Sequence, residues 1–338
     1  MHVYPRNMNN HTASRAAATT ASAAAAVIGA SGYTGQEVVR LLRAHPHIRL
    51  VAATSESERG QRVPGTALQY VAPEDVKLEA DLVFTCLPHG ESGAWSVRAH
   101  EAGARVVDLS ADLRAGGHGA VYGVPEFWRD AIRVGSLIAN PGCYPMGILF
   151  SLAPLLRAGM VDLTRTVIID AASGVTGAGR SAKREYLFGE VADDYRAYAV
   201  GNAHRHVPEI AQALARVNGG AAPEFVFTPH LLPVRRGILE TLYIPVVAGV
   251  TPLAAVSACA TAYAAEPMVE IERTGLPSLR QVVGRNVMAI GFSAVSGVSA
   301  PMLVCVAAFD NLLKGAAGQA VQNANVMSGW GELEGIPL

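Results

Sequence analysis

Residues 24–42, AAAVIGASGYTGQEVVRLL, join a short apolar run to an amphipathic helical pattern through a glycine-rich turn. Its glycines have the spacing G-x-x-G-x-x-G. Between a strand and a helix, such a turn lets the backbone approach a pyrophosphate closely, and the free N–H groups at the helix start can bind it. A purely structural turn is the alternative, because a glycine motif alone has low specificity. Its place at the first strand-to-helix junction favours a dinucleotide site, formed by Gly29, Ser31, Gly32, Tyr33, Thr34 and Gly35.

Apolar runs and helical patterns alternate on the C-terminal side of this turn. Runs at 48–53, 82–87 and 105–109 are separated by helical stretches, an order typical of an α/β, Rossmann-type, doubly wound parallel sheet. The pattern changes near residue 140. Beyond it, longer β-rich runs predict an α+β domain with a largely antiparallel sheet; the runs are 166–170, 225–229, 239–247 and 302–309, with helices at 145–158, 208–217 and 311–329.

The composition of the 338 residues excludes several classes of protein. Half of the residues are apolar and 16% are charged, which is typical of a globular enzyme, and the length predicts two domains. A net charge of −1 gives no basic surface for nucleic acid or an anionic membrane. We also find no run of the ~18 apolar residues that could span a bilayer. The four cysteines include no CxxC pair, so we expect no disulfide framework, no metal site and a reducing compartment.

The first 22 residues are polar and then rich in Ala, Ser and Thr, with two Arg and no acidic residue. Organellar transit peptides have a similar composition, but a disordered leader is the simpler interpretation. We therefore expect a leader over 1–22 and a cytoplasmic protein.

The residues after the second apolar run bear on the choice of cofactor. This stretch, 54–59, has the sequence TSESER. Hydroxyl groups and a cation suit the 2′-phosphate of NADP, whereas an acid here usually binds the ribose hydroxyls of NAD. We interpret Ser55, Ser57 and Arg59 as NADP-binding residues and the two acids, Glu56 and Glu58, as parts of a solvated loop. NADP(H) is therefore the expected cofactor.

Cys143 lies in the stretch NPGCYP, residues 140–145, a turn that leads directly into a helix. A helix N-terminus favours the thiolate, the reactive form of cysteine. We therefore interpret Cys143 as a nucleophile, with a buried turn cysteine as the alternative. The other cysteines lie in apolar strands or an Ala-rich helix and are expected to be small core residues: Cys86, Cys259 and Cys305.

Two histidines flank Arg205 immediately before a helix start at residues 208–210. A thiolate that attacks an acyl group needs a proton-transfer partner with a pKa near neutrality, and histidine is the usual one. His204 and His206 are therefore candidate acid–base residues, although paired histidines are also common at polar surfaces. His230 is either structural or part of the site.

Several longer stretches resemble, in the same order, those of the N-acetyl-γ-glutamyl-phosphate reductase family, which is related to aspartate-semialdehyde dehydrogenase. They are GASGYTG at Gly29, LPHGES at Leu87, VVDLSADLR at Val106, ANPGCYP at Ala139, SGVTGAGR at Ser173, HRHVPEI at His204, FTPHLLPVRRGIL at Phe227 and DNLLKGAAGQAVQNANVM at Asp310. The resemblance runs from about Val27 to the C-terminus. So many motifs in the same order make it highly specific.

The resemblance implies a reaction and a role for each motif. Cys143 would attack a γ-acyl phosphate and release phosphate, and hydride from NADPH would reduce the thioester to N-acetylglutamate 5-semialdehyde, a step of arginine biosynthesis. His206 would be the general acid–base, with His204 close by. The implied substrate ligands are Ser110, Arg114, Asn140 and Arg180, and further cofactor ligands are Pro88, Gly174, Asn311 and Gly315.

The resemblance also implies the domain organisation and the assembly. The helix that contains Lys314 and Gly318 would return to the first domain and pack beside the nicotinamide. The dinucleotide-binding domain would then be 23–141 plus 311–338, and the catalytic and dimerisation domain 142–310. The implied partners are a small-molecule substrate and phosphate, in a homodimer or homotetramer.

Three places depart from the pattern of the family. Glu56 stands where a residue suited to a 2′-phosphate is common, and Arg285 stands where a small residue is typical. Met146 and Gly147 follow the nucleophile where small or hydroxylated residues are more usual. No departure removes a catalytic group.

Three other functions are compatible with parts of this pattern. A reductase of carrier-linked aminoadipyl phosphate in lysine biosynthesis would share every catalytic residue and differ only in pocket shape. The NPGCYP and HRHVPEI stretches disfavour aspartate-semialdehyde dehydrogenase itself. A non-catalytic NADP-binding regulator is disfavoured because Cys143, His204 and His206 are all intact.

Overall fold

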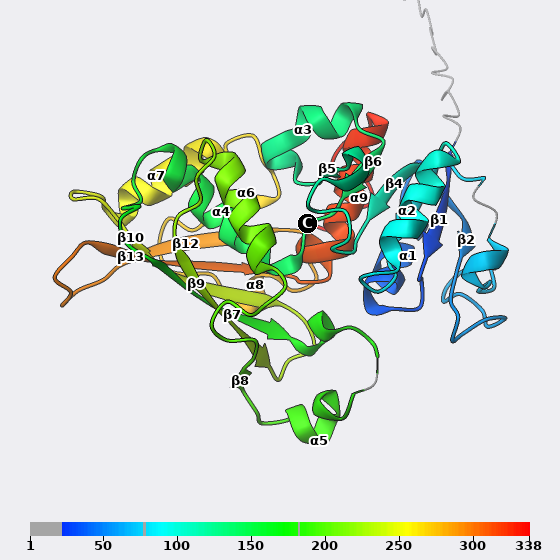
Figure 1. Ribbon diagram of the computed structural model, residues 1–338, viewed down its shortest axis with the longest axis horizontal. Helices are drawn as coiled ribbons and strands as arrows, with labels where there is room; N and C mark the ends of the chain where they lie inside the picture. Colours follow the sequence, from blue (N-terminus) through cyan, green and yellow to red (C-terminus); the bar gives the residue numbers. More distant parts are fainter. Residues whose placement is uncertain (1–21, 77–78, 182) are drawn as a thin grey trace, which may run out of the picture.

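The computed structural model describes residues 22–76, 79–181 and 183–338, and the expected leader lies, apart from Ser22, outside them. The described residues form two units, each built around one β-sheet (Figure 1). None of the helices in these ranges has the length and apolar character that a bilayer crossing requires.

The first unit contains a six-stranded sheet with the order β2-β1-β3-β4-β6-β5, in which every pair is parallel. The predicted doubly wound sheet is confirmed: α1 (Tyr33–Arg43) buries the apolar stripe seen in the sequence, and α2 (Ser92–Glu101) and α3 (Pro125–Val134) follow later strands. The strands are β1 (Ala23–Ile28), β2 (Ile48–Ala53), β3 (Leu82–Thr85), β4 (Arg105–Asp108), β5 (Val121–Tyr122) and β6 (Leu137–Ala139).

The second unit contains a seven-stranded sheet with the order β11-β12-β13-β10-β7-β9-β8. Four of its strand pairs are antiparallel and two, β11–β12 and β7–β9, are parallel, so the sheet is mixed and largely antiparallel, as predicted. The strands are β7 (Val167–Gly174), β8 (Arg196–Ala197), β9 (Phe225–Leu232), β10 (Ile238–Pro245), β11 (Val269–Ile271), β12 (Met288–Ala294) and β13 (Met302–Phe309).

Helices cover one face of this second sheet (Figure 1). The long helix α4 (Cys143–Arg157) is apolar almost all round and packs on the sheet and against two further helices, α6 (Val207–Val217) and α7 (Pro252–Ala262), of which α7 also contacts β11 and β12. Two short helices, α5 (Phe188–Val191) and α8 (Leu279–Val282), lie in loops. The largest apolar core of the molecule is formed between α4 and the inward-facing residues of the strands.

The strand order of the first sheet reverses at β1: the chain adds β2 on one side of β1 and then β3 on the other side. Ligands of doubly wound sheets bind at the carboxyl ends of strands at such a switch point. The glycine turn begins there. Gly29 has a φ of +82°, and a Cβ on Gly35 would lie 2.3 Å from the Gly29 carbonyl oxygen, so the close contact between β1 and α1 requires glycine.

The C-terminal segment returns to the first unit. The predicted single helix is divided into a π-helical turn, η5 (Leu313–Ala317), and α9 (Gly318–Ser328). α9 packs against α1 and α3, and its apolar side chains belong to the core on one face of the first sheet. On these contacts we propose that residues 23–141 and 311–338 form one domain and residues 142–310 the other.

Candidate active site

Two cavities meet at Cys143. The larger, called here the interunit cleft, has a volume of about 1070 Å³ and is lined by the glycine turn, the segments after β2 and β3, the turn at 140–143 and the start of the C-terminal segment. The smaller, the side pocket, has a volume of about 430 Å³ and is lined by residues between 143 and 231. The residues that line both are Cys143, Gly177, Ala178, Arg205 and His206.

Most of the cofactor residues expected from the sequence line the interunit cleft: Gly29, Ser31, Gly32, Tyr33, Thr34, Ser55, Pro88, Asn311 and Gly315. Three do not. Gly35 lies behind the turn, and Gly174 ends β7 beneath the backbone of residues 234–236. Arg59 points away and pairs with Asp75 at the surface.

Arg180 lies beside the glycine turn and not at the acyl site where the sequence analysis expected it. Its guanidinium donates to the Ser31 carbonyl at 2.7 Å and to Glu58 at 2.5 Å. The Ser55 hydroxyl donates to that of Ser31 at 2.7 Å. The hydroxyls of Ser31 and Ser55 and the guanidinium of Arg180 therefore lie together near the end of β2. The sequence analysis had expected the cation there to be Arg59, whereas Arg180 belongs to the second unit.

The other expected substrate ligands hold the backbone in place. The Ser110 hydroxyl donates to Asp108 at 2.9 Å and does not line either cavity. Asn140 lines the interunit cleft, but its amide nitrogen donates to the Ala316 carbonyl and its oxygen accepts from Asn323. These side chains position the turns around the site.

Glu209 joins the two units at the turn before Cys143. Its carboxylate accepts hydrogen bonds from Arg114 Nη1 at 2.9 Å, from the Tyr122 hydroxyl at 2.7 Å and from the backbone N–H of Gly142 at 2.8 Å. Arg114 and Glu209 are 6% and 8% exposed. A buried carboxylate thus connects α6, the first sheet and the nucleophile turn.

Arg114 lines the interunit cleft, yet its hydrogen-bonding groups are largely used. Besides Glu209, its Nε donates to the Asn140 carbonyl at 2.9 Å and its Nη2 to the Leu109 carbonyl at 3.1 Å. The carboxylate offsets its charge. An anionic substrate would therefore gain less from Arg114 than the sequence suggested.

Cys143 is the first residue of α4, two residues before the helix start expected from the sequence, but its thiol is not ionised in advance. Burial raises the pKa of Cys143 to about 11, although the charges of Arg205 and Arg114 and a backbone N–H at Tyr144 lower it. The helix-start effect is present, and burial outweighs it. The resting form at neutral pH is the thiol.

His206 packs against the nucleophile turn. It is 3% exposed, and a Cβ on Gly142 would lie 2.6 Å from its Nε2. Burial, together with the charge of Arg114, lowers the pKa of His206 well below its usual value. Burial and the neighbouring Arg205 lower the pKa of His204 to about 4. Both imidazoles are neutral at pH 7 and can accept a proton there.

The roles of the two histidines differ by position. His204 lines only the side pocket, and its Nδ1 accepts the backbone N–H of His206 at 3.2 Å. The ring centroids lie 4.7 Å apart, and both rings contact Tyr144 edge-on. His230 lines neither cavity and stacks on Tyr195, so it is structural.

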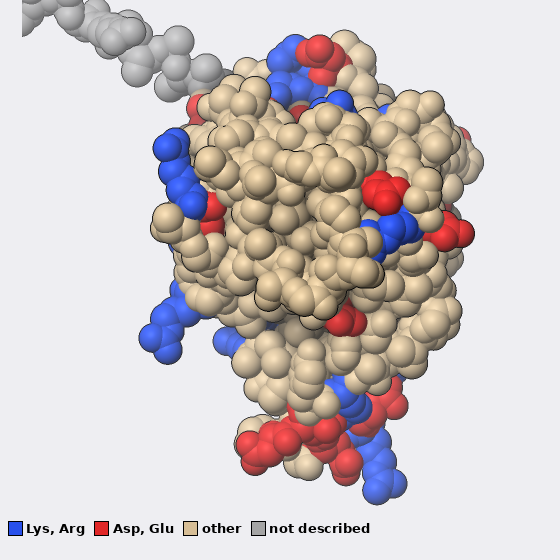
Figure 2. Space-filling view, turned by 90° about the vertical axis from the view of Figure 1, so that its left-hand side faces the viewer, with Lys and Arg blue, Asp and Glu red and all other residues tan. Residues whose placement is uncertain are grey.

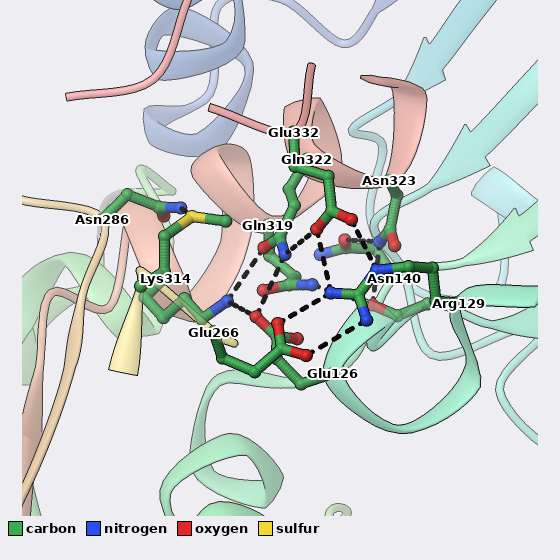
Figure 3. A network of polar contacts seen from close by, with 12 residues as sticks. Glu126, Arg129, Asn140, Glu266, Asn286, Lys314, Gln319, Gln322, Asn323 and Glu332 are labelled. Carbon is green, nitrogen blue, oxygen red and sulfur yellow. Dashed lines mark hydrogen bonds and ion pairs between the residues drawn. The ribbon is translucent and has the colours of Figure 1, made fainter. Parts of the chain in front are cut away.

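A buried polar network holds the C-terminal segment against the site (Figure 3). Lys314 and Glu126 are fully buried and 2.6 Å apart, and Gln322 contacts both. Asn323 extends the network to the side chain of Asn140. The network fixes the π-turn η5, a feature that is frequent at functional sites.

Gly315 brings the backbone of η5 next to the nucleophile. A Cβ on Gly315 would lie 3.1 Å from the Cβ of Cys143. A side chain there would press on Cys143 and on the Phe309 ring, so glycine permits this close approach of η5 to the nucleophile.

Sequence reasoning missed Glu209 and Tyr122, and it placed Lys314 beside the cofactor without its buried partner Glu126. Glu209 was seen only as part of a helix start, where acids are common for reasons of capping. The only available signal was its place three residues after His206. The bonds to Arg114 and Gly142 depend on tertiary contacts over 95 and 67 residues and have no local pattern.

Family models match both units of the chain. A model described as "Semialdehyde dehydrogenase, NAD binding domain" matches residues 24–134, and one described as "Semialdehyde dehydrogenase, dimerisation domain" matches residues 143–311. The chain is 42% identical to the N-acetyl-gamma-glutamyl-phosphate reductase of Pelobacter propionicus, over 92% of this chain and 97% of that protein. It is 41% identical to the protein of the same name from Moorella thermoacetica, over 90% and 95%.

Solved structures share the fold. Aspartate semialdehyde dehydrogenase II of Vibrio cholerae, complexed with ASA, superposes with a TM-score of 0.74 at 20% identity, over 91% of this chain and 98% of that chain. Aspartate semialdehyde dehydrogenase of Candida albicans with NADP gives a TM-score of 0.69 at 18% identity, over 90% and 98%. At these identities the likeness concerns the fold alone.

The protonated resting thiol leads to a test on the free chain. We expect the rate of Cys143 alkylation by iodoacetamide to rise about tenfold per pH unit from pH 6 to pH 9, because the thiolate fraction of a thiol with a pKa of about 11 grows by that factor. Cys143→Ala identifies the labelled residue. A rate that levels off below pH 8 would instead indicate a preformed thiolate.

Proposed function

The chain belongs to the N-acetyl-γ-glutamyl-phosphate reductase family, and we propose that Cys143 carries its reaction as a covalent nucleophile. The enzyme reduces N-acetyl-γ-glutamyl phosphate to N-acetylglutamate 5-semialdehyde with NADPH and releases phosphate, a step of arginine biosynthesis. The position of Cys143 carries the proposal: with His206, it lines both cavities. An acyl chain in the side pocket and a nicotinamide in the interunit cleft then meet at the thiol.

His206 takes the thiol proton in the first step. Its pKa is lowered, so it is neutral at pH 7 and can accept the proton as the sulfur attacks the acyl carbon. The S–C bond forms, the C–O bond to phosphate breaks, and a thioester remains on Cys143. Backbone N–H groups at the start of α4 stabilise the negative charge that develops on the acyl oxygen.

The second step consumes a proton rather than releasing one. NADPH, when bound, would supply the hydride that reduces the thioester to a hemithioacetal alkoxide on Cys143. The C–S bond of this alkoxide breaks to release the aldehyde, and the thiolate takes up a proton from solvent, by way of His206, to return the thiol. His204 supports His206 by accepting its backbone N–H and does not line the interunit cleft.

The residues of the interunit cleft fit NADP. The glycine turn leads into α1, whose first N–H groups have no side-chain cap and suit a pyrophosphate. We assign the 2′-phosphate to Ser31, Ser55 and Arg180. Arg180 is paired with Glu58 in this structure, so a phosphate there would replace the carboxylate as the partner of the guanidinium.

The cofactor assignment distinguishes two arginines. We expect Arg180→Gln to raise the KM for NADP about 10- to 100-fold, the effect of losing a charge-assisted hydrogen bond, while the KM for NAD changes little. Arg59→Gln is the matched control, because Arg59 pairs with Asp75 outside the cleft. Initial rates with each dinucleotide measure both. An effect of Arg59→Gln alone would return the 2′-phosphate to the position expected from the sequence.

The reaction is tested in the reverse direction. The chain should reduce NADP when given N-acetylglutamate 5-semialdehyde and inorganic phosphate, followed by absorbance of the reduced cofactor. Cys143→Ser should lower the rate at least about 10³-fold, because a hydroxyl is a far poorer nucleophile beside a neutral imidazole, and should leave NADP binding intact. Near-normal turnover of that variant would disprove the covalent route.

We propose that two copies of the chain pair through the open face of the second sheet. The larger helices of this unit cover the other face, whereas among the described residues the open face carries the short α8 at one end of β12 and β13 and presents alternate residues of the central strands, including Val226 and Tyr243, each 37% exposed. The outer end of this unit, near α7, carries few charged residues (Figure 2), and residues 241–265 and 286–309 contain none. The open face is therefore largely uncharged, with Asp170 of β7 as an exception. Such a surface fits a second copy, and two such dimers would form the homotetramer.

The pairing is tested by a charge on the open face. We expect Tyr243→Arg to shift the chain from a dimer or tetramer to a smaller species in sedimentation experiments, because two copies of the charge would be buried together. Val134→Arg is the control, since Val134 is 86% exposed on α3 in the first unit. An unchanged mass of the Tyr243 variant would place the interface elsewhere.

We also propose that the enzyme acts in the cytoplasm. All four cysteines are free thiols, and Cys143 must stay reduced to react. A reducing compartment keeps it so.

A further inference from the structure

Arg205 is the cation at the junction of the two cavities. It lines both the interunit cleft and the side pocket, as Cys143 does. Among the residues that the structure describes, no carboxylate or carbonyl accepts a hydrogen bond or an ion pair from its guanidinium. Its charge is the largest favourable influence on the Cys143 thiolate, since it lowers the pKa of Cys143 more than Arg114 does. Arg205 thus has no partner among the described residues and lines the same two cavities as Cys143.

The other arginines near the site already have acidic partners. Arg114 pairs with Glu209, Arg180 with Glu58, and Arg196 with Asp194, so each positive charge is offset by a carboxylate. Lys183 lines only the side pocket, where its ammonium lies 5.7 Å from the centre of the Tyr186 ring. An anion bonded to the reacting carbon must lie at the junction itself, and among the Arg and Lys residues that the structure describes, Arg205 is the one that lines both cavities.

His89 offers a second donor from the first unit. It lines the interunit cleft in the loop after β3, and its Nδ1 accepts the backbone N–H of Ala111 at 2.9 Å. The proton of the neutral ring therefore lies on Nε2, which is free to donate. Burial and then the charge of Arg205 keep the pKa of His89 below its usual value. Arg205 and His89 thus come from different units and line the same cleft.

We propose that Arg205 and His89 form the phosphate site of the enzyme, which binds the phosphoryl group of the acyl phosphate and then the inorganic phosphate that leaves. The inference rests on the proposed function and adds two residues to the substrate ligands that the resemblance implied, which were Ser110, Arg114, Asn140 and Arg180. Planar guanidinium groups bind phosphate oxygens in pairs. The cation that favours the thiolate is then the one that holds the leaving group.

The chemistry balances with the groups present. The proton of the Cys143 thiol passes to His206, the sulfur forms a bond to the acyl carbon, and the electron pair of the broken C–O bond stays on the phosphate oxygen. That oxygen takes the proton from His206 and leaves as hydrogen phosphate. Because the phosphate gains negative charge as the bond breaks, its interaction with Arg205 is stronger in the transition state than in the bound substrate.

The reverse reaction makes phosphate a substrate and so measures the site directly. With N-acetylglutamate 5-semialdehyde, NADP and inorganic phosphate, we expect Arg205→Gln to raise the KM for phosphate about 10- to 100-fold, and Arg205→Lys to raise it less. The KM values for NADP and aldehyde should stay within about twofold. His89→Leu should raise the KM for phosphate by about 3- to 10-fold, since a neutral donor contributes less. Arg216→Gln, on the exposed end of α6, is the control of equal charge.

A second measurement needs no turnover. Inorganic phosphate should slow the alkylation of Cys143 in the parent chain, and Arg205→Gln should abolish this protection, expressed as the ratio of rates without and with phosphate. If the parent fails to oxidise the semialdehyde but phosphate still protects, the proposed function is wrong and the anion site stands. If the KM for phosphate is unchanged in Arg205→Gln, or only Lys183→Gln raises it, the phosphate site is not at Arg205.

Discussion

The ion pair between Arg114 and Glu209 is the constraint from which the geometry of the site follows. Glu209 accepts three hydrogen bonds, one of them from the backbone of Gly142 immediately before the nucleophile. Loss of one partner of a buried pair typically costs about 3–5 kcal/mol, because the other charge stays buried without compensation. The pair thus links the first sheet, α6 and the start of α4. Because Glu209 follows His206 and binds the residue before Cys143, the same carboxylate determines the relative positions of these two side chains.

The distribution of charge explains why the free enzyme rests as a thiol. Burial raises the pKa of Cys143 and lowers the pKa of His206, so both groups are uncharged at pH 7. A neutral pair is the form that a desolvated site favours. Proton transfer then occurs when the substrate is attacked rather than beforehand. A resting thiol is also less open to oxidation than a thiolate, since reactivity follows the ionised form.

Features that depend on a few neighbouring residues were predictable from the sequence. The ion-pair partner of each charged side chain was not. The glycine turn follows from steric demands within a few residues, and Cys143 at a helix start follows from the turn that precedes it. The location of Arg180 was not predictable, because its partner Glu58 lies 122 residues away and belongs to the other unit. Arg59 satisfied the local pattern of a 2′-phosphate site, yet its side chain pairs with Asp75 at the surface. Charged side chains on loops select partners through tertiary structure.

The unusual Gly147 has its explanation in a buried acid. A Cβ at this position of α4 would lie 2.2 Å from Glu240 Oε2, and Glu240 is fully buried, with neither carboxyl oxygen bonded among the described residues. Burial raises the pKa of Glu240 well above its usual value and so favours the protonated, neutral acid. An ionised carboxylate beneath the helix would raise the pKa of Cys143 and oppose its reaction. Gly147, near the nucleophile on α4, therefore provides the space for Glu240. As long as Glu240 stays protonated, it does not oppose formation of the Cys143 thiolate.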